Sequence, residues 1–358
     1  MPWIDREAYL RVVRGETRGL RGVLARRALG GIAAGYAVAV GMRNALYDSG
    51  LWSAQRVGVP VVSVGNLTLG GTGKTPMVEW LARWYRDRGV RVALISRGYG
   101  SRREINDEGR VLEENLPDVP HLQDPDRVAS GWIAVRELES QLIILDDGFQ
   151  HRRLARDLDM VLLDSLDPFG QGRLFPRGLL REPVGSLRRA GVVMLTRADL
   201  VDRSRREEIW SLIERVTGSG VRLESRHAPV ELIDAEGGRF PLSELFARDV
   251  AAFCGIGNPD GFRRTIAPLC GRVLDFRVFP DHHPYNRADV RGLAAWAREL
   301  RPNLVLTTQK DLVKLRALSL GGVPLRGLRI GLEITVGLQA LEELLEPLVP
   351  ANPPVETS

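Results

Sequence analysis

The chain has 358 residues, of which 44% are hydrophobic and 27% are charged, which is typical of a soluble globular protein and long enough for two domains. Its formal net charge of +5 is too small to indicate a polyanionic partner, and we expect no nucleic-acid binding. Two cysteines, Cys254 and Cys270, exclude a disulfide framework and a cysteine-based zinc motif, so a reducing cytoplasm is the simplest compartment.

The first 60 residues combine a basic stretch with an apolar one. Seven arginines lie in the first 27 residues, with leucines and valines at helical spacing between them, and 15 uncharged residues follow from Ala28 to Met42. That apolar run is shorter than the ~20 residues that cross a bilayer. Two interpretations remain open: residues 1–60 are a basic amphipathic helical segment on an anionic membrane surface, or they are a helical pair packed on the protein.

From Val61 onward, apolar runs alternate with helical stretches, which predicts an α/β fold with a parallel sheet. The first series of strands is expected near residues 61, 92, 142, 160 and 192, and the second near 250, 274, 303 and 328. We therefore expect a P-loop NTPase-like sheet domain over 61–225 and a second, smaller α/β domain over 226–358 that closes a cleft.

The sequence GNLTLGGTGKTP at 65–76 predicts a phosphate-binding loop between a strand and a helix. Lys74 is one of only three lysines in an arginine-rich chain, and a compact ammonium fits between phosphates where a guanidinium does not. Thr75 would place its hydroxyl on Mg²⁺, and Thr68 stands where the usual pattern has glycine. The predicted nucleotide-binding residues are Thr68, Leu69, Gly70, Gly71, Thr72, Gly73, Lys74 and Thr75.

A second polar feature ends the predicted strand LIILDD. Asp146 and Asp147 come directly after its apolar residues, where P-loop proteins hold Mg²⁺ through a carboxylate. An isolated Asp-Asp pair is otherwise a turn or a helix cap, but the upstream P-loop favours the metal site.

A nucleotide switch is one function that this predicted P-loop could serve. The loop resembles the variant P-loop of membrane-targeting ATPases, except that Leu69 replaces their signature lysine, and TRAD at 196–199 resembles the guanine-reading element of GTPases. A membrane-associated ATPase or GTPase with a protein partner therefore stays open beside a kinase.

Seven motifs together resemble the bacterial tetraacyldisaccharide 4′-kinases. They are VGNLTLGGTGKTP, ISRGYGSR, DDGFQHRRLARDLD, LFPRGLLREP, GIGNPDGF, FPDHHPYN and TTQKDLVKL, and they occur in the family's order. The resemblance implies transfer of the γ-phosphate of ATP, with Mg²⁺, to the 4′-hydroxyl of a membrane-embedded lipid disaccharide in lipid A biosynthesis. It also implies a peripheral protein on the cytoplasmic face of the inner membrane that requires no protein partner.

The resemblance also assigns site residues. It places the metal-binding pair on Asp146 and Asp147, and acceptor-site positions on His151, Arg181 and Glu182. The family's first loop glycine is missing too, which accounts for Thr68.

The same resemblance supplies a catalytic pair. It places the catalytic aspartate on Asp107, although Asn106 and Gly109 depart from the family's element, and its histidine partner on His282, with His283 as a competitor. With the expected boundaries, Asp107 and His282 lie in different domains and would meet only when the cleft closes.

Overall fold

The computed structural model describes residues 6–98, 107–218, 220–281 and 283–350. The chain forms two compact units that do not divide at a single point in the sequence. The first contains Met1–Arg97, Leu122–Arg226 and Ile334–Ser358, and the second contains Gly98–His121 and His227–Glu333. Asp107, which the expected boundaries place with the P-loop, therefore belongs to the same unit as Asp281 and His283.

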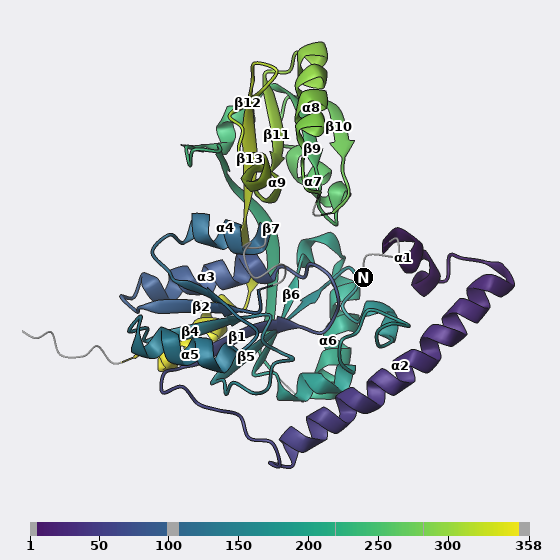
Figure 1. Ribbon diagram of the computed structural model, residues 1–358, viewed down its shortest axis with the longest axis vertical. Helices are drawn as coiled ribbons and strands as arrows, with labels where there is room; N and C mark the ends of the chain where they lie inside the picture. The colour runs from purple at the N-terminus through teal and green to yellow at the C-terminus, as the bar shows by residue number, and fades with distance from the viewer. Residues whose placement is uncertain (1–5, 99–106, 219, 282, 351–358) are drawn as a thin grey trace, which may run out of the picture. The chain divides into compact units, whose positions relative to one another are not determined.

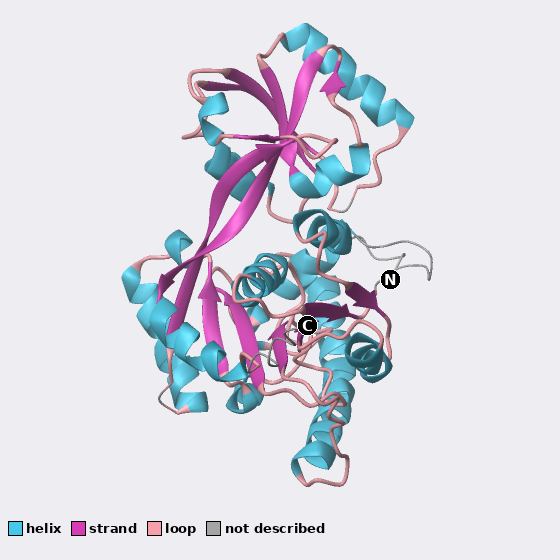
Figure 2. Cartoon of the chain, turned by 90° about the vertical axis from the view of Figure 1, so that its left-hand side faces the viewer, coloured by secondary structure: helices cyan, strands magenta, loops and turns pink. Residues whose placement is uncertain are grey.

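The first unit is a parallel sheet with helices on both faces (Figures 1 and 2). Its strand order is β7-β6-β5-β1-β4-β2-β3, and the pairings of β1 with β4 and β5, of β2 with β4, and of β6 with β5 and β7 are parallel. The strands are β1 (Val61–Asn66), β2 (Val92–Ser96), β3 (His121–Gln123), β4 (Leu142–Asp146), β5 (Leu158–Asp164), β6 (Val192–Thr196) and β7 (Arg222–Ile233).

Continuous apolar runs form these central strands because both faces of the sheet are covered. Every residue of β1, β2 and β4 is buried. One face packs on α5 (Arg127–Arg136) and α6 (Arg203–Thr217), while α3 (Lys74–Arg86) contacts β1, β2 and β4. α10 (Leu338–Leu345) packs on α3, where Trp84 Nε1 donates a 3.0 Å hydrogen bond to Glu342.

The N-terminal helices differ from the expected division into a basic and an apolar segment. α1 (Arg6–Arg14) is short, and α2 (Gly19–Asp48) is one uninterrupted helix of 30 residues that contains both the later arginines and the apolar run (Figure 1). By length and composition α2 could cross a bilayer, whereas the 15-residue run judged alone could not. The helix extends beyond the apolar run because leucine, arginine and alanine continue it on both sides.

The second unit is also a sheet with helices on both faces. α7 (Pro259–Ile266) packs against Val250 and Ala252, and α8 (Arg287–Leu300) packs against the alternate residues Ala251 and Phe253. Its other elements are α4 (Asp107–Asn115), β8 (Arg239–Phe240), β9 (Asp249–Cys254), β10 (Arg272–Val278), β11 (Leu304–Thr308), α9 (Gln309–Leu315), β12 (Ser319–Leu320) and β13 (Val323–Val336). The predicted α/β class and the main predicted strands are confirmed, while the short strands β3, β8 and β12 were not anticipated individually.

Candidate active site

The glycine-rich loop connects β1 to α3 at the carboxyl edge of the first sheet. Gly70 and Gly73 have φ angles of 127° and 85°, which disfavour side chains, and Gly73 is the N-cap of α3. The loop therefore ends at a helix N-terminus, where backbone N–H groups favour a phosphate. Gly65 precedes the loop because a Cβ there would lie 2.5 Å from Phe149 Cβ, so only glycine lets the DDGF turn approach β1.

Residues at the end of β6 hold two carbonyls of this loop. Thr196 Oγ1 donates to Thr72 O at 2.9 Å, and Arg197 Nη2 donates to Gly71 O at 2.9 Å. Arg197 also forms an ion pair with Asp164 at the end of β5, although burial raises the pKa of that carboxyl. The TRAD element thus fixes the loop's backbone through its arginine, a role that its resemblance to a base-reading element did not predict.

Asp147 lies immediately after β4 and faces the P-loop lysine. Its φ of 52° turns the chain sharply, and its Oδ1 lies 3.5 Å from Lys74 Nζ. Arg181 Nη1 lies 2.8 Å from both carboxylate oxygens, and Arg127 donates to the Asp147 carbonyl at 3.0 Å. Burial favours the neutral acid, but Lys74 and Arg181 outweigh it and hold the pKa of Asp147 below its ordinary value.

The segment that carries Arg181 runs beside the P-loop. Leu69 N donates to Leu179 O at 2.7 Å, and Arg181 N donates to Leu67 O at 2.7 Å. These two bonds join the loop before Lys74 to residues more than a hundred positions later in the chain. They place the Arg181 side chain at Asp147, where it also lies 3.3 Å from Gln150 Oε1.

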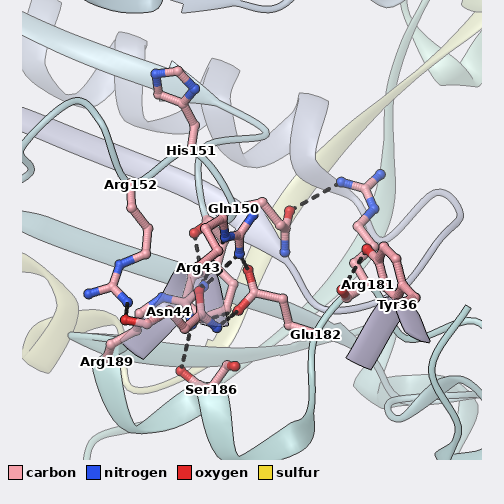
Figure 3. Close-up of polar contacts among 12 residues, drawn as sticks. Tyr36, Arg43, Asn44, Gln150, His151, Arg152, Arg181, Glu182, Ser186 and Arg189 are labelled. Atoms are coloured by element: carbon pink, nitrogen blue, oxygen red, sulfur yellow. Dashed lines mark hydrogen bonds and ion pairs between the residues drawn. The ribbon is translucent and has the colours of Figure 1, made fainter. Parts of the chain in front are cut away.

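Glu182 lies in a different polar cluster from Asp147, with Arg43, Asn44 and Arg189 (Figure 3). Its side chain is 0% exposed and lies 2.7 Å from Arg43 and 2.8 Å from Arg189, and Asn44 Nδ2 donates to it at 3.0 Å. Burial favours the neutral acid, but Arg189, Asn44 and Arg43 together lower the pKa of Glu182. The carboxylate therefore links the end of α2 to residues 182–189 of the same unit.

His151 also points away from the group around Glu182 in Figure 3. Its Nε2 is buried without a hydrogen-bond partner among the described residues. Burial, reinforced by Arg127 and Arg156, lowers the pKa of His151 to about 4. The ring is therefore neutral at pH 7 and can accept or donate one hydrogen bond. Asp146, at the end of β4, is buried beside Asp147.

The predicted catalytic pair is described only in part. Asp107 is the first residue of α4, with its side chain outside the described part, and His282 lies outside it entirely. The neighbouring His283 is held by its surroundings: its Nε2 lies 2.9 Å from Asp289, and its ring packs 5.0 Å from Phe279 and 4.9 Å from Tyr285.

A family model described as tetraacyldisaccharide-1-P 4′-kinase matches residues 25–349, which is most of the chain. The chain belongs to this kinase family. The tetraacyldisaccharide 4′-kinase of Anaeromyxobacter dehalogenans strain 2CP-C is 42% identical over 332 residues, covering 87% of each chain. That of Syntrophus aciditrophicus strain SB is 40% identical over 306 residues, covering 78% of this chain and 82% of the relative.

A solved structure of a family member shares the fold. The apo form of LpxK from Aquifex aeolicus in complex with ATP is 29% identical, with a TM-score of 0.71 over 91% of this chain and 100% of that one. The resemblance inferred from the motifs is thereby confirmed, and the tetraacyldisaccharide 4′-kinase family is favoured over a nucleotide switch.

Of the residues expected in the site of this kinase family, the structure brings together Lys74, Asp147 and Arg181. Glu182 instead binds Arg43 and Arg189, and His151 points away from the group around Glu182 in Figure 3. Sequence reasoning missed Arg127, which has no local motif of its own and is recognised only by the backbone carbonyl that it binds. It also missed the contact of Arg197 with the P-loop backbone, because the TRAD element was compared with a base-reading motif.

Proposed function

We propose that the chain transfers the γ-phosphate of ATP to the 4′-hydroxyl of a tetraacyldisaccharide 1-phosphate, the step of lipid A biosynthesis that gives lipid IVA. The arrangement of Lys74 and Arg181 around Asp147, beside the P-loop of a member of this family, carries the proposal. The test is transfer of labelled phosphate from ATP to that acceptor in detergent micelles. Labelled product that depends on the acceptor supports the proposal, whereas hydrolysis of ATP at the same rate without acceptor contradicts it.

The P-loop residues 68–75 would hold the nucleotide in this proposal. Their backbone N–H groups and the start of α3 favour the phosphates, and Lys74 would neutralise the outer ones. The lowered pKa of Asp147 keeps this carboxylate charged, as a ligand of a hard cation must be. Thr75, Asp146 and Asp147 would hold Mg²⁺, which when bound supplies charge neutralisation to the transferring phosphate.

Proton removal from the acceptor is assigned to Asp107, with His282 orienting that carboxylate. The engagement of His283 by Asp289 supports His282 as the partner. Asp107→Ala is expected to lower kcat by roughly 10²–10⁴-fold with little change in the KM for ATP. His282→Ala should act in the same direction, and the double variant should lose much less than the product of the two losses.

Acceptor contacts would come from Arg181 and His151. Arg181 already lies at Asp147, so it can meet the transferring group, and the neutral ring of His151 can hydrogen-bond to a sugar. Glu182 would act through position, because its enclosed carboxylate binds Arg43 and Arg189 rather than facing the P-loop.

The exposed apolar face of α2 supports membrane attachment. Leu20, Ile32, Val38 and Met42 are 61–74% exposed along this helix, and arginines accompany them near its start. We place the protein on the cytoplasmic face of the inner membrane, peripherally bound through residues 1–60, with no protein partner.

Vesicle binding tests this placement. Four Arg→Glu changes within residues 11–27 should release the protein from anionic vesicles, since each basic residue near the surface contributes about 1 kcal/mol. Unchanged binding would contradict the surface interaction, and resistance to high salt with release only by detergent would indicate that α2 spans the bilayer instead.

A further inference from the structure

Residues 147–154 follow β4 directly, and we call them the aspartate turn. Arg156 lies just beyond this turn and binds its backbone. Arg156 Nη1 donates to His151 O at 2.7 Å, and Arg156 Nη2 donates to Phe149 O at 3.2 Å. Nη1 makes longer contacts, of 3.4 and 3.5 Å, with the carbonyls of Leu154 and Gly148. One guanidinium therefore contacts four carbonyls of the same turn.

The carbonyls of the aspartate turn depend on side chains for their hydrogen bonds. The turn lies wholly within the described range 107–218, and its residues form neither a helix nor a strand. Phe149 and Leu154 are 0% exposed, so their backbone is shielded from water. Arg189 Nη2 also donates to Phe149 O, at 3.0 Å. Because a buried carbonyl without a donor is unfavourable, the arginines stabilise this shape of the backbone.

Asp159 in β5 holds the Arg156 side chain. Arg156 Nε lies 2.9 Å from Asp159 Oδ2, and the two side chains are 10% and 6% exposed. A guanidinium is planar, so an Nε that is fixed by the carboxylate sets the direction of both Nη groups. Burial raises the pKa of Asp159, and the Arg156 guanidinium opposes this shift. The pair therefore aims the remaining donors of Arg156 at the aspartate turn.

The backbone of the aspartate turn also places the Asp147 carboxylate beside the P-loop. Gly148 N donates to Val64 O at 3.0 Å, and a Cβ on Gly148 would lie 2.4 Å from Ser63 Oγ. The turn therefore packs directly on β1, the strand that leads into the P-loop. Asp147 precedes this contact with a φ of 52°, so a shift of the turn would move its carboxylate relative to Lys74.

Two nearby arginines of the sequence HRRLAR, residues 151–156, have other partners. Arg153 is 51% exposed and lies 3.3 Å from Asp126. Arg152 lies 2.7 Å from Asp48, at the end of α2. Arg156 is the arginine of this sequence whose side chain is enclosed and bound to the aspartate turn. Arg153 is therefore a matched control for substitutions at Arg156.

We propose that Arg156 is a positioning residue for Mg²⁺ binding, because it fixes the backbone of the aspartate turn and so keeps the Asp147 carboxylate beside the P-loop. The inference rests on the proposed function, which assigns Asp146 and Asp147 to Mg²⁺, and adds a residue that acts through the backbone. Residues that hold metal ligands in place typically change the metal affinity by roughly 10- to 100-fold when they are replaced.

The affinity for ATP with and without Mg²⁺ tests the proposal. Calorimetric titration of ATP in saturating Mg²⁺ and in EDTA gives the factor by which the metal strengthens nucleotide binding. Arg156→Lys keeps the charge, but a single ammonium cannot bind Asp159 and the turn carbonyls in the planar arrangement of a guanidinium. We expect this factor to fall roughly tenfold or more, while the Kd of ATP in EDTA stays within about twofold because the P-loop is unchanged.

Amide hydrogen exchange gives a second readout that needs neither metal nor nucleotide. In Arg156→Lys, exchange should rise in residues 147–154 and stay as in wild type in β1 and α3, because the loss is local. Arg153→Lys changes an exposed arginine of the same segment and should match wild type in both measurements. Asp159→Asn should act in the direction of Arg156→Lys, and combining the two substitutions should add little, since they disrupt one set of contacts.

The outcomes separate this inference from the proposed function. An unchanged Mg²⁺ factor in Arg156→Lys would overturn the proposal, and so would exchange that rises throughout the first unit, because Arg156 would then support the fold in general. If Mg²⁺ does not strengthen ATP binding in wild type, the assignment of Asp146 and Asp147 to the metal is wrong and the inference falls with it. If the factor falls as expected but wild type transfers no phosphate to the tetraacyldisaccharide 1-phosphate, the kinase function is overturned and the role of Arg156 stands.

Discussion

Asp147 and Glu182 are both buried carboxylates surrounded by basic groups, yet their surroundings differ in kind. The side chain of Asp147 is 14% exposed, and its partners Lys74 and Arg181 come from two loops at the sheet edge. Glu182 follows Arg181 in the sequence but is 0% exposed, and its partners Arg43, Asn44 and Arg189 come from two helical segments.

The adjacent residues Arg181 and Glu182 therefore have different roles: Arg181 contacts Asp147 at the P-loop, and Glu182 holds a buried cluster together. Glu182 is enclosed by three fixed partners, so removing one leaves a buried charge without compensation. Asp147 keeps access to solvent, and a phosphate could engage its partners Lys74 and Arg181. The Asp147 carboxylate could then exchange these partners for another positive charge. Burial and a lowered pKa alone do not separate these roles, because both carboxylates have them.

Replacing Lys74, the partner of the partly exposed Asp147, should have the largest effect on activity. Lys74→Arg keeps the charge but puts a longer, planar group into a loop shaped for phosphates. We expect a loss of about 10²–10³-fold in kcat, typical for one electrostatic contact in a transition state, with an unchanged melting temperature. Turnover like wild type would show that Lys74 is not at the transferred phosphate.

Removing the charge of the buried Glu182 should lower the stability of the fold instead. Glu182→Gln leaves Arg43 and Arg189 without their counter-charge, and we expect a loss of about 3–5 kcal/mol in the free energy of unfolding. Denaturant titration measures it. Asp147→Asn is the matched change at the open site and should lose activity with a smaller change in stability. The reverse pattern would show that the two roles have been exchanged.

Arg197 combines the two kinds of contact. It donates a hydrogen bond to the P-loop backbone, and it also forms an ion pair with the carboxylate of Asp164. Arg197→Ala releases Gly71 O and leaves Asp164 unpaired, so the loop should hold phosphate less well. We expect about a tenfold weaker affinity for ATP with kcat changed less, since one charged hydrogen bond is lost. The affinity for ATP is measured by calorimetric titration. Comparing Arg197→Ala with the Asp164→Asn/Arg197→Ala double variant separates the loss of the loop contact from destabilisation by the unpaired Asp164.

Acid should weaken the first unit in two stages. The pKa of His151 is lowered to about 4, so the unfolded chain binds its proton first and stability falls as the pH drops from about 6.5 toward 4. Asp147 and Glu182 have lowered pKa values, so their contribution is complete above about pH 4 and is lost as the pH falls through their folded values.

Melting temperatures across this range check the assignment. His151→Gln should flatten the first stage, and Glu182→Gln should flatten the second. A single transition unaffected by either substitution would contradict it.

Sequence alone predicted the parts of the structure that depend on neighbours in the chain. The strand before the P-loop, its glycines and the aspartates after β4 all carry local patterns, and they lie where those patterns indicated. The hydrogen bonds of Arg181 with Asp147 and of Arg43 with Glu182 join residues 34 and 139 positions apart. No local pattern encodes such pairs, because the sheet order decides which loops meet.

The full extent of α2 was not predicted, for a related reason. The apolar run from Ala28 to Met42 was judged by its own length, but α2 continues through Arg21 and Arg27 because arginine is a good helix former. The TRAD element was compared with a base-reading motif, whereas the arginine that replaces lysine reaches the loop carbonyl and Asp164.

The contact of α10 with α3 has a consequence for synthesis of the protein. Tyr85, near the end of the P-loop helix, donates a hydrogen bond to Leu345 O, 260 residues later. At ~5–20 residues per second, a ribosome needs roughly 13 to 50 s to add the partner after the helix is made. Throughout that interval the apolar side of α3 that α10 covers is exposed. We expect newly made chains to require protection there, and the nucleotide-binding unit to complete its packing only after α10 has emerged.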